Sequence, residues 1–204
     1  MRGVMLMLAV GSVGLAACAT TSRQAEITGV PLRVLRDPLI EGRRVAVLTE
    51  DWFYCYPPSR ELILVPRGYM TDFASVPKIS PFAPFGKHAE AAIVHDWLYA
   101  VGEPNQRQKA DEIFRYAMAE QKVPVMTRNA MYEAVRLGGE AAYGRATEWM
   151  KRFANPATGE PEAPRFKKPA SAIVQPNVDC RILNSQSGLK GLRERYRSVD
   201  WPRA

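Results

Sequence analysis

The spacing of apolar residues divides the chain into a strand-rich part and a helical part. Between Pro31 and Pro77, short runs of alternating apolar residues are separated by prolines and glycines, which is typical of short strands joined by turns. We expect these strands to form a small antiparallel sheet. Their expected ranges are 32–35, 45–49, 52–56 and 61–65.

After Pro84 the apolar residues recur every three to four positions, which indicates amphipathic helices. Three helices are expected, and the Val123-Pro124 pair separates the last two. Their expected ranges are 89–100, 105–122 and 127–153. The predicted fold class is therefore α+β, with a small antiparallel sheet followed by three helices.

The N-terminus has the pattern of a bacterial lipoprotein signal. Arg2 supplies a positive charge, and residues 4–17 form an uncharged apolar run that is shorter than the roughly 20 residues a membrane-spanning helix needs. The run ends in Leu15-Ala16-Ala17-Cys18, which resembles the lipobox, where signal peptidase cuts before a cysteine that then carries lipid. We expect a signal peptide at 1–17 and a lipidated Cys18 with a flexible tether at 18–29.

This resemblance also implies a location. Lipid on Cys18 would anchor the protein in the cell envelope of a Gram-negative bacterium, with membrane lipid as its partner. Ala19 stands where the inner-membrane retention signal has Asp, so the resemblance implies the outer membrane, with the protein facing the periplasm.

Composition supports one globular domain with a basic extension. The 204 residues are 47% hydrophobic and carry a net charge of +7. We place the domain at 30–154 and an extended or disordered tail at 155–204, where six prolines and nine Lys or Arg occur against five Asp or Glu. The basic tail suggests an anionic envelope partner. Nucleic acid is not expected, because no binding motif is present and export argues against it.

Two cysteines remain once Cys18 is assigned to lipid. Cys55 and Cys180 would lie in a compartment where disulfides persist. Their positions in the sequence allow a disulfide or two free thiols, because spacing alone does not show whether the two Cα atoms approach each other.

Four motifs carry a resemblance to a known family. They are Pro66-Arg-Gly-Tyr-Met-Thr-Asp-Phe-Ala-Ser-Val-Pro77, His95-Asp-Trp-Leu-Tyr99, Ala110-Asp-Glu-Ile-Phe114 and Met131-Tyr-Glu-Ala-Val-Arg-Leu-Gly-Gly139. In this order they resemble the bacterial and phage family of unknown function numbered 1353, over about residues 30–150. The family implies no activity, so function is argued from the residues.

The polar residues of the two central motifs could form a catalytic pair. If the first two helices pack antiparallel, Asp111 can approach His95. A carboxylate bonded to one imidazole nitrogen leaves the other nitrogen to accept a proton from water. Tyr99 lies one turn after His95 and could bond to the same carboxylate. We therefore name His95, Asp111 and Tyr99 as candidate catalytic residues.

The same arrangement resembles the helix pair of phospholipase A2. The resemblance implies that His95 is the base, Asp111 its orienting carboxylate and Asp96 a calcium ligand, with Asp72 as a further oxygen ligand. The glycine-rich calcium loop and the paired cysteines of that family are absent from this sequence. The cofactor is otherwise unknown.

Two other kinds of site that use these residues fit the sequence less well. His88, His95-Asp96 and Asp111 are spaced too closely for a His/Asp metal phosphohydrolase, and a Ser75–His95–Asp111 triad lacks the Gly-x-Ser-x-Gly turn.

A purely structural interpretation is that Asp72 and Ser75 cap a strand-to-loop turn and that His95 is a hydrogen-bonded core residue. In this interpretation Asp96 pairs with an arginine such as Arg128 or Arg136, and Asp111 caps a helix. We expect an envelope lipoprotein whose domain is a binding or structural module. A His/Asp hydrolase that acts on phospholipid is the alternative.

Overall fold

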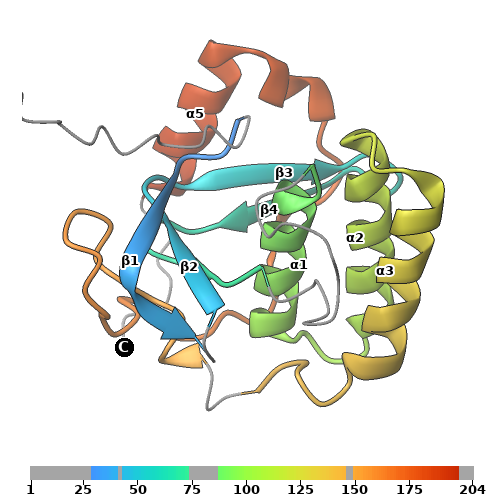
Figure 1. Ribbon diagram of the computed structural model, residues 1–204. Helices are drawn as coiled ribbons and strands as arrows, with labels where there is room; N and C mark the ends of the chain where they lie inside the picture. The colour runs from blue at the N-terminus through green and yellow to red at the C-terminus, as the bar shows by residue number, and fades with distance from the viewer. Residues whose placement is uncertain (1–28, 41–42, 74–86, 146–148, 198–204) are drawn as a thin grey trace, which may run out of the picture.

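The computed structural model describes residues 29–40, 43–73, 87–145 and 149–197. Within them the chain forms two three-stranded antiparallel sheets and four α-helices (Figure 1), which confirms the α+β class. One sheet has the order β1-β2-β5, from Leu32–Ile40, Arg43–Leu48 and Met70–Thr71. The other has the order β3-β4-β6, from Trp52–Tyr56, Glu61–Val65 and Ile173–Gln175. The expected signal peptide, Cys18 and most of the tether lie outside the described residues.

Three helices follow the first five strands, and the fourth lies near the C-terminus. They are α1 (Ala89–Val101), α2 (Arg107–Glu120), α3 (Val125–Gly138) and α5 (Gln186–Tyr196), and the short 3-10 helix η1 (Cys180–Asn184) precedes α5. Within the described residues, no helix is both long enough and apolar enough to cross a membrane.

The β3-β4-β6 sheet is the platform on which the helices pack. In β3, Phe53 and Cys55 point to one face and are buried there, so the strand alternates between the two faces as a period of two requires. Ile63 and Val65 of β4 join the core of α1 and α2, whereas Leu62 and Leu64 contact the C-terminal segment. The sheet is therefore covered on both faces (Figure 1).

The C-terminal segment is folded, which corrects the expectation of an extended or disordered tail. Strand β6 pairs with β4, and Leu192 of α5 packs with Val178 on the outer face of the sheet. A disulfide joins Cys55 in β3 to Cys180 in η1, with a Cα–Cα distance of 5.5 Å. Sequence pattern missed this packing because only scattered apolar residues of the segment are buried.

The third helix is much shorter than the expected range of 127–153. It begins after Pro124 and ends at Gly138, with Gly139 as its C-cap. Two consecutive glycines weaken a helix, and any side chain at Gly139 would collide with the hydroxyl of Tyr99. The end of α3 is thus fitted against α1.

Replacement of both Cys55 and Cys180 by serine is expected to lower the free energy of unfolding by about 2–4 kcal/mol, because the bond links residues 125 positions apart. Urea denaturation measures this change. The measurement uses the chain from residue 18 onward, in which Cys18→Ser is the control and should leave the unfolding midpoint unchanged. Equal midpoints for the double variant and the unchanged protein would show that the bond does not stabilise the fold.

Candidate functional site

Helices α1 and α2 bring His95 and Asp111 together, as their helical spacing predicted. Gly102 ends α1 in the left-handed conformation (φ 58°), and the chain then turns back into α2. The Nε2 atom of His95 lies 2.9 Å from Oδ1 of Asp111. The two side chains are 3% and 0% exposed, so the pair is buried between the helices.

Tyr99 completes the group predicted on α1. Its hydroxyl donates a hydrogen bond of 2.7 Å to the same Oδ1 of Asp111, and its ring lies against that of His95 with centroids 4.2 Å apart. Burial and the neighbouring carboxylate both raise the pKa of Tyr99, so its hydroxyl stays protonated and acts as a donor.

Two arginines, which were not predicted as partners of Asp111, hold its second oxygen. Nη1 of Arg136 in α3 lies 3.3 Å from Oδ2, and Nη1 of Arg107, one turn before Asp111 in α2, lies 3.6 Å from it. The i,i+4 spacing of Arg107 and Asp111 in the sequence is enough to indicate this ion pair. The expectation that Arg136 pairs with Asp96, and that Asp111 caps a helix, is wrong.

The electrostatic balance keeps Asp111 ionised. Burial by itself raises the pKa of this carboxyl, but hydrogen bonds from His95, Tyr99 and Arg136 outweigh burial and hold the pKa below its usual value. The negative charge of Asp111 therefore has partners on three helices, α1, α2 and α3. We call His95, Tyr99, Arg107, Asp111 and Arg136 the Asp111 network.

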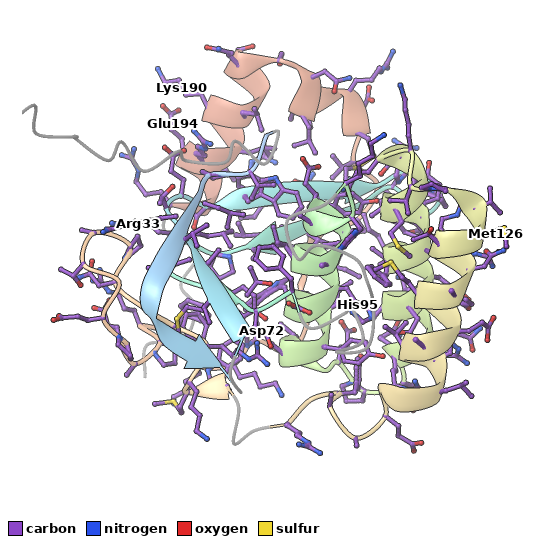
Figure 2. The ribbon with its side chains drawn as sticks, in the orientation of Figure 1. Arg33, Asp72, His95, Met126, Lys190 and Glu194 are labelled. Atoms are coloured by element: carbon purple, nitrogen blue, oxygen red, sulfur yellow. A yellow bond between two sulfur atoms is a disulfide. The ribbon has the colours of Figure 1, made fainter. Side chains whose placement is uncertain are left out.

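Asp96 points away from this network, because adjacent helical residues lie about 100° apart. It faces β5, where the hydroxyl of Thr71 donates a 2.6 Å hydrogen bond to Oδ2 of Asp96. Nearby, Nη1 of Arg152 donates a 2.7 Å hydrogen bond to Oδ1 of Asp72. Figure 2 shows Asp72 on the sheet side of α1 and His95 on the side that faces α2.

Burial and the charge of Asp72 raise the pKa of Asp96, whereas Arg152 lowers it. Arg152 is thus the resident cation of this second polar centre, and sequence reasoning did not identify it. Within the described residues, no group of three or more His, Cys, Asp or Glu side chains could hold a metal ion. Calcium at Asp96 and Asp72 stays a prediction, and one of its two expected carboxylates already binds a guanidinium.

The structure also bears on the other interpretations. His88 is buried immediately before α1, and burial lowers its pKa. Ser75 lies outside the described residues.

One comparison with known proteins gives a match. Residues 46–135 match the model of a family described as "Protein of unknown function (DUF1353)". This part of the chain is therefore similar to the DUF1353 family. No curated protein and no solved structure gives a significant match. His95, Tyr99, Arg107 and Asp111 lie within the DUF1353 match, whereas Arg136 lies one residue beyond it.

Asp111→Asn is expected to destabilise the protein by about 3–5 kcal/mol, because Arg107 and Arg136 would lose a buried counter-charge. Urea denaturation at neutral pH measures the loss. Glu112→Gln is the matched control at the exposed neighbouring position, and it should change the free energy of unfolding by less than about 0.5 kcal/mol. If Asp111→Asn also lowered the free energy of unfolding by less than about 0.5 kcal/mol, the stabilising role of the Asp111 network would be contradicted.

The difference in stability between the unchanged protein and Asp111→Asn is predicted to depend on pH. The folded-state pKa of Asp111 is lowered, so its contribution to stability is present above the unfolded-state value of about 3.9 and is lost as the pH falls through the folded-state value. The stability difference between the unchanged protein and Asp111→Asn should therefore shrink below about pH 4. A difference that grows in acid would contradict this assignment.

Proposed function

We propose that this protein is an envelope lipoprotein, anchored through Cys18, whose DUF1353 domain is a binding module held rigid by the Asp111 network. The main support for this structural role is the number of partners that one buried carboxylate, that of Asp111, has. Asp111 is 0% exposed and has partners from α1, α2 and α3. Such a centre fixes the mutual positions of the helices.

Two features favour this role over catalysis. A general base must reach a water molecule or substrate, and the side chain of His95 is only 3% exposed. An orienting carboxylate assists a base because it stabilises the imidazolium that forms. Here Arg107 and Arg136 lie 3.6 and 3.3 Å from Oδ2 of Asp111, so this carboxylate is shared with two arginines and is not dedicated to His95.

A His/Asp hydrolase that acts on phospholipid is the second candidate, and one observation favours it. His95 Nε2 and the Tyr99 hydroxyl both contact Oδ1 of Asp111, which is the arrangement that the phospholipase A2 resemblance implies for a base and its support. Asp96, the implied calcium ligand, points to a different side of α1 and contacts Thr71. Lipid anchoring would place such an enzyme beside its substrate.

Hydrolysis is tested with phospholipid vesicles, in calcium and in EDTA. Under the binding-module proposal, the protein releases no fatty acid above the vesicle blank in either buffer. The hydrolase candidate instead requires release that falls about 100-fold or more in His95→Ala. His88→Ala, which replaces the other of the two histidines, is the matched control. If the protein releases fatty acid, and His95→Ala abolishes this release whereas His88→Ala preserves it, the binding-module proposal is wrong and the hydrolase candidate is supported.

Anchoring is tested separately in the full chain expressed in a Gram-negative host. Cys18→Ser is expected to abolish acylation and to leave the unprocessed precursor, because the modified cysteine defines the cleavage site. Metabolic labelling with palmitate and the mass of the product measure both effects. The matched control is Cys55→Ser, which should still be acylated. Normal processing of Cys18→Ser would refute the lipoprotein assignment.

A further inference from the structure

Helix α5 presents a basic surface on the outer side of the β3-β4-β6 sheet. Leu192 and Tyr196 pack toward the sheet, and the opposite side of the helix carries Lys190, whose side chain is 79% exposed. Figure 2 shows Lys190 and Glu194 directed outward from α5. The apolar side of α5 already covers this face of the sheet. The outward side of the helix can therefore contact a partner.

Basic residues outnumber acidic ones on this surface, although Arg193 is paired with Glu50 and Arg195 donates a 3.2 Å hydrogen bond to Gln175. Between residues 186 and 197 the only acidic residue is Glu194, against the basic residues Lys190, Arg193, Arg195 and Arg197. The Lys190–Glu194 pair is loose at 3.9 Å and both side chains are more than half exposed. An exposed ion pair of this kind contributes little free energy, so Lys190 can exchange Glu194 for another anion. We call the four basic residues the α5 basic surface.

The chain enters the described domain beside this surface. The carbonyl of Pro31 accepts a 2.8 Å hydrogen bond from the amide of Thr49, and the next residue, Glu50, forms a 2.7 Å ion pair with Arg193. Figure 1 shows the start of β1 next to α5. A tether that leads from Cys18 therefore joins the domain on the side where α5 lies.

We propose that the α5 basic surface binds the anionic phospholipid headgroups of the membrane in which the protein is anchored. This inference rests on the envelope location proposed above, and it adds an orientation: α5 faces the lipid. Each basic residue near an anionic membrane strengthens binding, and several act together even without apolar insertion. The disulfide between Cys55 and Cys180 ties η1, which immediately precedes α5, to β3, so the surface is held to the domain.

Helix α3 offers a competing surface. Met126 and Leu137 are 87% and 86% exposed and lie eleven residues apart on one face of the helix. Glu133 lies between them on that face, and its charge opposes both membrane insertion and contact with anionic lipid. Met126 lies on a different side of the molecule from Lys190 (Figure 2).

The test is co-sedimentation of the chain from residue 18 onward, with Cys18→Ser to prevent acylation, with vesicles of phosphatidylglycerol and phosphatidylcholine. Binding is expected to these vesicles and not to pure phosphatidylcholine, and it should weaken as salt is raised. Lys190→Glu with Arg195→Glu should lower the partition coefficient at least about tenfold. Arg115→Glu with Lys122→Glu, at exposed positions in and just after α2, changes the net charge equally and is the matched control. Unchanged unfolding midpoints establish that both variants fold.

Loss of binding in the α5 variant alone supports the proposal. Equal loss in both variants would reduce the effect to net charge and overturn it, as would loss only in the control, which would point to the surface around α3. No binding of the parent protein to anionic vesicles would also overturn it. Each outcome is independent of acylation, so failure here is distinct from failure of the Cys18 anchor.

Discussion

The burial of one negative charge between three helices is the constraint on which the helical half of this protein depends. Asp111 has no exposed surface, and a buried carboxylate without partners would cost several kcal/mol. Its hydrogen bonds to α1 and its ion pairs with Arg107 and Arg136 remove that cost only when the helices are in their native positions. The charge therefore favours the native arrangement of the helices, in which all of these partners reach Asp111. Gly139 fits the same arrangement, since a larger residue would displace Tyr99.

Helix α1 is shared by two polar centres that are adjacent in sequence and separate in space. His95 faces the Asp111 network, whereas Asp96 faces Thr71 on β5. The first centre orders helices against each other, and the second connects α1 to the sheet side, where Arg152 compensates Asp72. This division explains why a histidine followed by an aspartate need not act on one atom. It also separates the residues that a calcium-dependent hydrolase would have to use jointly.

Local pattern predicted much of this structure, and long-range contacts account for the rest. The bounds of β3 and β4 and the approach of Asp111 to His95 follow from strand alternation and helical periodicity, which each segment carries by itself. The two-residue strand β5 and the three-residue β6 exist only through pairing with distant strands, so the split into two sheets had no local signal. The folding of the C-terminal segment likewise depends on a disulfide and a few buried residues. Arg136 was one of two arginines expected beside Asp96, and it pairs with Asp111 instead, because sequence spacing does not show which side of α1 faces α3.

A double-mutant cycle between Asp111→Asn and Tyr99→Phe, followed by urea denaturation, tests the central claim most directly. If Asp111 is the common centre of one network, the two substitutions remove overlapping interactions. The double variant should then lose less stability than the sum of the single losses, by about 1 kcal/mol or more. Additive losses would show that Tyr99 and Asp111 act independently, and would contradict the account of a single buried charge that orders the helices.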